Sequence, residues 1–523
     1  MGKKEELIDL IGQSFQTGGT SILLGAAKFE DEVLQNALVH APLKTFNRHG
    51  LIAGATGTGK TKTLQNLAEQ LSKNGVPTLL MDIKGDLSGI SRAGSNNPKI
   101  EERHSKIGTT WEATAFPVEF LSISDEKGVK MRATISEFGP VLLSKILGLN
   151  DTQSGVVSMI FKYCDDKRLP LLDIKDFRKI CQHLQTPEGK QAIEEEYGLA
   201  SSASIGAIMR NILEVEQQGA DVFFGEPSFE VDDLVRTDSR GYGYCNVLRL
   251  ADLQAKPDLF STFMLCLMAE IYEKFEERGD QDKPKLCIFI DEAHLIFNEA
   301  SKALLNQITT IVKLIRSKGV GIYFITQDPT DVPEEVLGQL GMKIQHALRA
   351  FTEKDRKSIK TIAENFPPSD YYKTSDLLTA LGIGEALVTV LNEKGIPTPL
   401  VHTYLTAPMS RMDVITEAEL DETIADSELV KVYNTTVDRE SAYEILSGKI
   451  KSHAGDEQEE EAKEVEEKEE KSSGPKEKSI FEKVMDSPVT NTILKELTRG
   501  IFGVLGAKSP RSSSRKRKST SWF

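Results

Sequence analysis

GLIAGATGTGKT, residues 50–61, combines a short apolar run with a glycine-rich loop that ends in lysine and threonine. The residues that follow place Leu64, Leu67 and Leu71 at helical spacing. The loop fits the pattern GxxxxGK[ST], in which glycines let the backbone wrap around phosphate oxygens. The N-terminus of the next helix adds positive potential at the same place. The sequence therefore predicts a phosphate-binding loop between a buried strand and a helix.

Each position of this loop has an expected role in binding ATP. Lys60 is expected to reach the β- and γ-phosphates, and the hydroxyl of Thr61 is expected to bind Mg²⁺. Backbone N–H groups along the loop are expected to hold phosphate oxygens. The residues expected to bind the nucleotide are Gly54, Ala55, Thr56, Gly57, Thr58, Gly59, Lys60, Thr61 and Lys62.

A second motif, KLCIFIDEAH at residues 285–294, places two carboxylates after a predicted buried strand. The C-terminal ends of strands are where ligands bind in open α/β sheets. We expect Asp291 to hold Mg²⁺ or its water, and Glu292 to act as general base toward the attacking water. His294 is expected to make a hydrogen bond at a helix start, and the alternative is that it couples the site to movement. The two motifs together predict an ATPase with Mg²⁺ as its cofactor.

Four further polar features have two interpretations each. Gln327 follows the predicted strand at 321–326 and either orients water and senses the γ-phosphate or only bonds the strand end. Arg316 precedes that strand and either reaches a neighbouring subunit's nucleotide or lies on the surface. The polar residues of MDIKGD, residues 81–86, either orient water or Mg²⁺ or cap the next segment. Arg349 either senses nucleotide across a subunit boundary or pairs with an acid.

The pattern along the chain predicts an α/β fold with a mostly parallel sheet. Strands are expected at 20–26, 50–53, 78–83, 244–250, 285–290, 321–326 and 344–351, and 385–391 as a late edge strand or hairpin. Helices are expected at 141–149, 155–162, 174–184 and 205–217. The expected regions are a lead-in (1–45), the first core part (46–95), a mostly helical insertion (96–239), the second core part (240–410), a peripheral helical segment (411–450) and a charged, disordered tail (451–523).

Composition limits the function classes. The net charge is −15, of which the acidic run between Asp456 and Glu470 contributes −8. This negative net charge argues against non-specific binding of nucleic acid over the whole protein surface. A basic channel inside a ring of subunits stays compatible with it. The final segment RSSSRKRKSTSWF is basic and is either a solvated tail or a weak anion or nucleic-acid contact.

The N-terminus and the cysteines indicate a cytoplasmic protein. Acids stand where a signal peptide needs an apolar run, and no stretch approaches the ~20 apolar residues of a membrane span. The five cysteines form no CxxC pair, which favours reduced, buried thiols.

Five segments resemble the bacterial HerA-like ATPases, and within them the YjgR-type subgroup: NRHGLIAGATGTGKT, LLMDIKGDLSG, GLNDTQSGVVSMIF, FIDEAHLIF and LIRSKGVGIYFITQDPTDVPEEVLGQLG. The resemblance covers residues 20–412 and implies a RecA-like core of the FtsK–HerA superfamily, whose better-known members form hexameric rings that pump DNA. It implies that Lys60 and Thr61 are the Walker A residues, Asp291 and Glu292 the Walker B pair, Gln327 the strand-end sensor and Arg316 a trans-acting arginine finger.

Two functions from different classes remain open at this point. The first is a ring-forming ATPase that moves double-stranded DNA. The second is an ATP-gated assembly or regulatory protein whose partner is a protein, which the acidic balance favours; a small-molecule kinase is a weaker third. HerA helicases carry an N-terminal β-barrel that docks a nuclease, and only residues 1–53 precede the loop here. A nuclease partner is therefore not expected.

Overall fold

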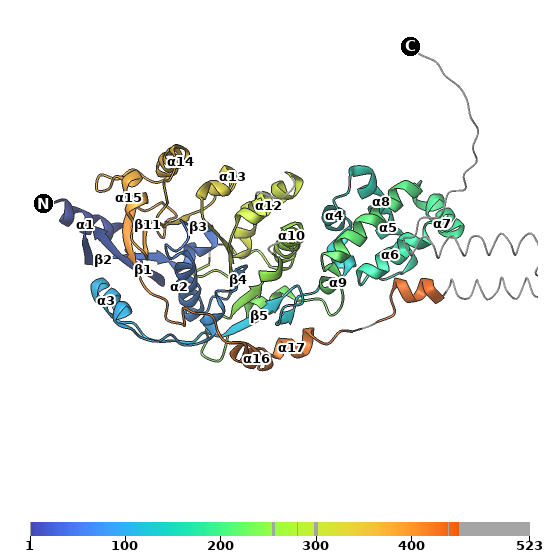
Figure 1. Cartoon of the computed structure of the whole chain (residues 1–523), viewed down its shortest axis with the longest axis horizontal. Coiled ribbons are helices and arrows are strands. Elements are labelled where there is room, and N and C mark those ends of the chain that lie inside the picture. The colour runs from blue at the N-terminus through green and yellow to red at the C-terminus, as the bar shows by residue number, and fades with distance from the viewer. Residues whose placement is uncertain (1, 254–256, 280, 298–301, 438, 449–523) are drawn as a thin grey trace, which may run out of the picture. The chain divides into compact units, whose positions relative to one another are not determined.

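One sheet organises the part of the chain that the structure, a computed structural model, describes (Figure 1). The described residues are 2–253, 257–279, 281–297, 302–437 and 439–448, so the predicted charged tail at 451–523 lies outside them. The sheet has twelve strands in the order β2-β1-β12-β11-β10-β3-β9-β8-β4-β7-β5-β6. Their bounds are β1 Ser21–Phe29, β2 Glu32–Pro42, β3 Gly50–Ala53, β4 Thr78–Asp82, β5 Val118–Ser122, β6 Val129–Lys130, β7 Cys245–Arg249, β8 Leu286–Ile290, β9 Val320–Thr326, β10 Met342–Gln345, β11 Glu385–Thr389 and β12 Val401–Leu405.

The strands from β10 to β6 pair in parallel, which confirms the expected mostly parallel sheet. The other end of the sheet is antiparallel, because β11, β12, β1 and β2 each run against their neighbours. Residues 385–391 were expected as an edge strand or a hairpin, and the hairpin is correct. β11 lies between β10 and β12, and the edge strands of the sheet are β2 and β6.

Helices cover both faces of the sheet, and alternate strand residues point to each. In β8, Ile288 packs into the core under α10 and α12, whereas Phe289 packs into the core under α2. Burial on both faces explains why the parallel strands are apolar throughout. The helices are α1 Lys3–Ser14, α2 Lys60–Lys73, α3 Pro98–Ile107, α4 Ile135–Ile146, α5 Asp151–Lys167, α6 Ile174–His183, α7 Pro187–Tyr197, α8 Ser202–Gln217, α9 Ala220–Phe223, α10 Pro257–Lys274, α11 His294–Phe297, α12 Lys302–Ile315, α13 Glu334–Leu337, α14 Glu353–Glu364, α15 Thr374–Ala380, α16 Glu417–Ala425 and α17 Glu428–Tyr433.

Helices α4 to α9 gather into one cluster beyond the α10 side of the sheet (Figure 1). The helices expected at 141–149, 155–162, 174–184 and 205–217 are present there as α4, α5, α6 and α8. The same region of sequence also contributes strands β5 and β6, which belong to the sheet. We did not predict these two strands, because they are short and precede a long helical pattern.

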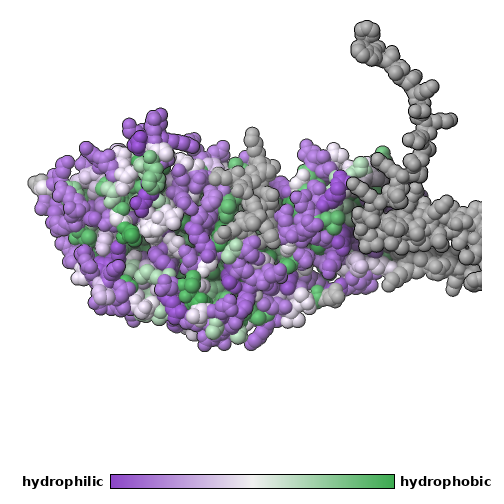
Figure 2. All heavy atoms as spheres, viewed as in Figure 1, coloured by the Kyte–Doolittle hydropathy of each residue, from purple (hydrophilic) through white to green (hydrophobic). Residues whose placement is uncertain are grey.

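The surface is mainly hydrophilic on the face drawn in Figure 2, where hydrophobic residues occur in small scattered groups. Within the described residues, no helix combines the length and the apolar character that crossing a bilayer requires.

Candidate functional site

The two predicted motifs meet at the C-terminal edge of the sheet, although their strands are not neighbours. β9 lies between β3, which leads into the glycine-rich loop, and β8, which leads into the acid pair. The register pairs Ala53 with Thr326 and Ile290 with Phe324, so β3 and β9 end at one level and β8 ends two residues before it. The loop, the acid pair and Gln327 therefore emerge side by side.

The loop needs glycine at several positions. Gly54, Gly57 and Gly59 have φ values of 148°, 79° and 114°, a region that L side chains rarely adopt. At Gly54 a Cβ atom would also lie 2.6 Å from Cβ of His346. The backbone is tied to its neighbours, because Gly54 N donates to Thr326 O (3.2 Å) and Ala55 N donates to Ala347 O (2.8 Å).

The loop offers hydrogen-bond donors suited to phosphate oxygens. No described residue accepts a hydrogen bond from the backbone N–H of Gly57, Gly59, Lys60 or Thr61. Lys60 is largely buried and its Nζ donates to Ala55 O at 3.1 Å, across the inside of the loop. Burial and the positive charge of Lys84 both lower the pKa of Lys60. This arrangement favours an anion inside the loop.

The acid pair is nearly buried, with side chains exposed by 5% for Asp291 and 9% for Glu292. Glu292 has φ 49°, which is strained for a residue with a side chain and is typical of functional sites. Its backbone N–H donates to Asp291 Oδ1 at 2.9 Å. Burial raises the pKa of Asp291. One oxygen of Asp291 is thus used within the chain, and the other faces the site.

Lys84 is the principal cation beside these acids. Its Nζ forms an ion pair with Glu292 Oε1 and lies 3.8 Å from Asp291 Oδ2. Burial acts to raise the pKa of Glu292, but the hydrogen bond and charge of Lys84 and the charge of His294 outweigh it and lower that pKa. His294 Nδ1 lies 3.1 Å from Glu292 Oε2. For the segment MDIKGD, the structure therefore brings Lys84 to the site.

Asp82 of that segment serves as a cap. Asp82 accepts the backbone N–H groups of Gly85, Asp86 and Leu87, at 2.7, 3.1 and 3.1 Å. Burial raises the pKa of Asp82 to about 6. Its carboxylate is occupied by the turn, so the capping interpretation describes Asp82.

Gln327 joins the loop to the acid pair. The hydroxyl of Thr56 donates to Gln327 Oε1 at 3.3 Å, and Gln327 Nε2 donates to Glu292 Oε1 at 3.5 Å. An amide in this place contacts both the phosphate loop and the expected general base. It is well placed to orient a water molecule between them.

By residue type, the hydroxyl of Thr61 and the carboxylate of Asp291 could hold a Mg²⁺ ion that also binds phosphate. Such ions take one or two protein oxygens and leave the remaining positions to phosphate and water. Asp291 Oδ2 has only the Lys84 ammonium near it, at 3.8 Å, among its ion pairs in the described residues. The described residues contain no cluster of three or more His, Cys, Asp or Glu side chains that could hold a metal ion by themselves.

Two predicted residues, Arg316 and Lys62, do not point into the site of their own chain. Arg316 is exposed at the N-terminal end of β9, whereas Gln327 follows its C-terminal end. The two positions are about 20 Å apart along the strand. Lys62 directs its Nζ to Met412 O and to Gln65 Oε1 (3.2 Å), so its side chain turns toward the following segment. Arg349 is exposed after β10.

His346 belongs to the site and was not predicted. It is fully buried after β10, its Nε2 lies 3.0 Å from Thr63 Oγ1 in α2, and its Cβ limits the space at Gly54. Burial and the charge of Lys60 lower its pKa to about 4. The predicted strand at 344–351 includes His346, whereas β10 ends at Gln345, so the sequence did not mark His346 as a strand-end residue.

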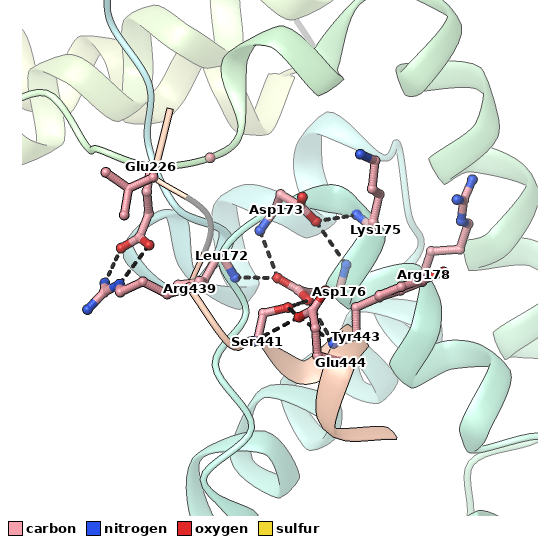
Figure 3. Close-up of a pocket in the computed structure, with 12 residues that line it drawn as sticks. Leu172, Asp173, Lys175, Asp176, Arg178, Glu226, Arg439, Ser441, Tyr443 and Glu444 are labelled. Atoms are coloured by element: carbon pink, nitrogen blue, oxygen red, sulfur yellow. Dashed lines mark hydrogen bonds and ion pairs between the residues drawn. The ribbon is translucent and has the colours of Figure 1, made fainter. Parts of the chain in front are cut away.

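A separate hollow of about 410 Å³ lies at the start of α6 (Figure 3). Asp176 accepts hydrogen bonds there from Ser441 Oγ (2.5 Å) and Tyr443 N (2.9 Å), and Arg439 Nε donates to Glu226 Oε2 at 2.8 Å. These charged groups are paired within the chain. They fix the C-terminal described segment against the helical cluster.

The sequence of this chain is similar to a known protein family and to named proteins. A family model described as "Helicase HerA-like C-terminal" matches residues 28–510. The DNA double-strand break repair helicase HerA of Sulfolobus acidocaldarius is 21% identical over 366 residues, which cover 69% of this chain and 66% of that protein. The DNA import protein CedB of the same organism is 22% identical over 366 residues, which cover 68% of this chain and 52% of CedB.

Among solved structures, the bacterial conjugative coupling protein TrwBdeltaN70 aligns with a TM-score of 0.51 and 14% identity. The alignment covers 78% of this chain and 93% of that chain. The likeness shows the same RecA-like fold. The chain spans slightly less than two thirds of the length of the HerA relative, 66%.

Proposed function

The chain belongs to the HerA-like helicase C-terminal family, and from this membership and the geometry of its site we propose that it is an ATP-hydrolysing motor. The observation that carries the proposal is the meeting of the glycine-rich loop, Gln327 and Glu292 at one edge of the sheet. Assignment to the YjgR-type bacterial subgroup stays a prediction.

Each residue of the proposed site has its own role in ATP hydrolysis. Backbone N–H groups of the loop and Lys60 bind the phosphate oxygens and stabilise the charge that spreads over the γ-phosphoryl group. Thr61 and Asp291 would hold Mg²⁺, which would neutralise phosphate charge when bound. Gln327 orients a water molecule, and Glu292 accepts its proton as the new bond to phosphorus forms. The bond from the γ-phosphorus to the bridging oxygen breaks, and ADP leaves with that oxygen.

The motor is a homo-oligomer in this proposal, with a hexameric ring as the expected form. Arg316 and the loop lie at opposite ends of the parallel strands, so Arg316 does not serve the site of its own chain. In a ring, the Arg316 edge of one subunit faces the loop edge of the next and supplies an arginine finger. Such fingers accelerate phosphoryl transfer by about 10³–10⁵-fold in other systems.

Double-stranded DNA is the proposed cargo. The named relatives HerA and CedB are DNA proteins by their names, and the family is one of helicases. The alternative is a protein partner, which the net charge of −15 favours. The test is the steady-state ATPase rate with and without double-stranded DNA over a series of salt concentrations. A DNA cargo predicts stimulation that weakens steeply as salt rises, because phosphate contacts release counterions. An unchanged rate at every salt concentration would point to the protein partner.

A further inference from the structure

Lys84 occupies the space between the two acids of the proposed ATPase site. Its ammonium pairs with Glu292 Oε1 and lies 3.8 Å from Asp291 Oδ2. The acids are nearly buried, whereas the side chain of Lys84 is 38% exposed. The lysine side chain therefore approaches the acids from the solvent-exposed side of the site, where a ligand can contact it.

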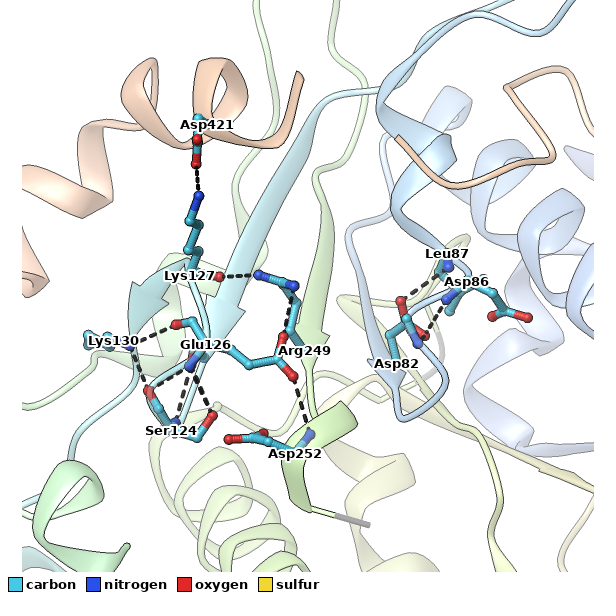
Figure 4. Close-up of polar contacts among 12 residues, drawn as sticks. Asp82, Asp86, Leu87, Ser124, Glu126, Lys127, Lys130, Arg249, Asp252 and Asp421 are labelled. Atoms are coloured by element: carbon cyan, nitrogen blue, oxygen red, sulfur yellow. Dashed lines mark hydrogen bonds and ion pairs between the residues drawn. The ribbon is translucent and has the colours of Figure 1, made fainter. Parts of the chain in front are cut away.

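The backbone that carries Lys84 is fixed. The turn after β4 is closed by the buried Asp82, whose carboxylate accepts the N–H groups of Gly85, Asp86 and Leu87 (Figure 4). Because these three bonds hold the turn, a change of partner by Lys84 needs only rotation of its flexible side chain.

The pairing conflicts with the role of Glu292 as general base. An ammonium bound to the carboxylate stabilises its charged form and makes it a weaker proton acceptor. Lys84 Nζ pairs with Oε1 of Glu292, the same oxygen to which Gln327 Nε2 donates, so the ammonium occupies the oxygen that faces the expected attacking water. Glu292 is thus restrained in this arrangement, and hydrolysis requires that the ammonium move away.

A second cation in the site gives Lys84 an alternative partner. Lys60 Nζ donates to Ala55 O inside the loop at 3.1 Å, and Lys84 Nζ pairs with Glu292, which Gln327 connects to Thr56 of the same loop. Each of these two cations is held by an oxygen of the chain, and an anion bound in the loop attracts both. In the proposed ATP complex, Lys60 binds the phosphates in the loop, and the γ-phosphate is the phosphate group nearest to Glu292.

We propose that Lys84 senses the γ-phosphate and releases Glu292 only when that group is bound. The inference rests on the proposed ATPase function. Lys84 exchanges the carboxylate of Glu292 for a γ-phosphate oxygen, and Glu292 then accepts the proton of the water that Gln327 orients. ADP lacks the γ-phosphate, so Lys84 stays on Glu292 in its presence. Lys84 is in this respect a positioning residue for Glu292.

The direct test is a double-mutant cycle with Lys84→Met and Glu292→Gln, read by the melting temperature of the full chain. The four proteins are compared without nucleotide, with Mg²⁺–ADP and with Mg²⁺–AMP-PNP. We expect non-additivity of about 2 °C or more in the first two conditions and additive shifts with AMP-PNP. Equal non-additivity in all three conditions, or none without nucleotide, would overturn the inference.

Binding affinity provides an independent readout. Lys84→Met is expected to weaken Mg²⁺–AMP-PNP about tenfold or more and to leave Mg²⁺–ADP nearly unchanged, because a charge-assisted bond to the γ-phosphate is lost. Lys84→Arg is expected to keep the preference for AMP-PNP. Equal loss of affinity for both nucleotides would show that Lys84 is only a structural partner of Glu292.

Lys127 offers a matched control. It also follows a parallel strand and pairs with an acid, since its Nζ lies 2.6 Å from Asp421 Oδ1 (Figure 4). Lys127→Met should leave both affinities unchanged. Failure of the wild-type chain to bind either nucleotide would remove the proposed function itself, whereas nucleotide binding with an unchanged preference in Lys84→Met would remove only the role of Lys84.

Discussion

The side-chain amide of Gln327 donates to Glu292 Oε1 across 3.5 Å, although the two residues are 35 positions apart in the chain. The contact exists because β9 lies directly beside β8, so the residues that follow both strands emerge together. Thr56 of the loop bonds the other side of the same amide at 3.3 Å. Three segments of the chain thereby form one continuous polar site.

The first prediction concerns the general base. Glu292→Gln should lower the rate of ATP hydrolysis by at least about 100-fold, because an amide cannot accept the proton of the attacking water. Nucleotide affinity should stay within about threefold. Single-turnover hydrolysis and equilibrium binding measure the two effects separately. Glu335→Gln, at an exposed pair with Lys313, is the control and should leave the rate unchanged. A full hydrolysis rate in Glu292→Gln would exclude Glu292 as the base.

The second prediction compares two glycines of the loop. Alanine is strained at both Gly54 and Gly57, because their φ values of 148° and 79° are positive; in the left-handed region this costs about 1–2 kcal/mol. Gly54→Ala also pushes a Cβ atom to 2.6 Å from His346, whereas no atom lies within 4 Å at Gly57. Overpacking of this kind adds about 1–3 kcal/mol. Urea unfolding should therefore show the larger loss of stability for Gly54→Ala, and equal losses would argue against the contact with His346.

The third prediction tests whether subunits share a site. Arg316→Ala and Lys60→Ala should each be inactive, since one removes the finger and the other the phosphate-binding lysine. A mixture of the two variants should regain part of the ATPase activity, because some interfaces then combine an intact loop with an intact arginine. Activity is measured after subunit exchange at several mixing ratios. A mixture that stays inactive although it forms mixed oligomers would rule out a finger acting between subunits.

The fourth prediction is a pH dependence of stability. Burial acts to raise the pKa of Glu385, but the bonds from His402 (2.9 Å) and Lys28 (2.7 Å) outweigh it and lower the pKa from 4.5 to about 2. A carboxylate with a lowered pKa stabilises the fold above its unfolded pKa and loses that contribution as pH falls. The difference in unfolding free energy between wild type and Glu385→Gln should be about 1–3 kcal/mol at pH 7 and should shrink between about pH 4.5 and pH 2.

Urea unfolding at a series of pH values checks this prediction. Glu32→Gln removes an exposed pair with Lys4 and serves as the control. Exposed pairs contribute about 0–1 kcal/mol, so this variant should differ little from wild type at any pH. A difference for Glu385→Gln that stays constant down to pH 3 would contradict the assignment.

The local parts of the fold were predictable because their signals lie within one segment. Residues 50–61 have the motif, the strand and the helix start together, and residues 285–294 have a buried strand and its acids together. The order of the sheet depends on pairing between distant segments. Nothing within residues 385–391 indicates that this segment, β11, also pairs with β10. β5 has only five residues and precedes a long helical region, so its pattern is too short to predict a strand.

The contacts within the site also depend on pairing between distant segments, which the sequence does not reveal. Gln327 was predictable because it follows a buried strand, but its contacts depend on β9 lying between β3 and β8. The choice between water orientation and capping in MDIKGD was open in the sequence. For Asp82 the structure shows capping, because its carboxylate accepts N–H groups of its own turn, whereas Lys84 extends to Glu292. Orientation of water or Mg²⁺ by this segment stays a prediction. His346 depends on the packing of β10 beside β3, which is again a long-range contact.

Binding of ATP with Mg²⁺ by the loop from Gly54 to Thr61 is measured by calorimetric titration of the purified chain with Mg²⁺–AMP-PNP. We expect one site per chain with a dissociation constant in the range of about 1 μM to 1 mM, and loss of this binding in Lys60→Ala. Absence of binding by the wild-type chain at several times the upper limit, or equal binding by Lys60→Ala, would contradict nucleotide binding by this loop.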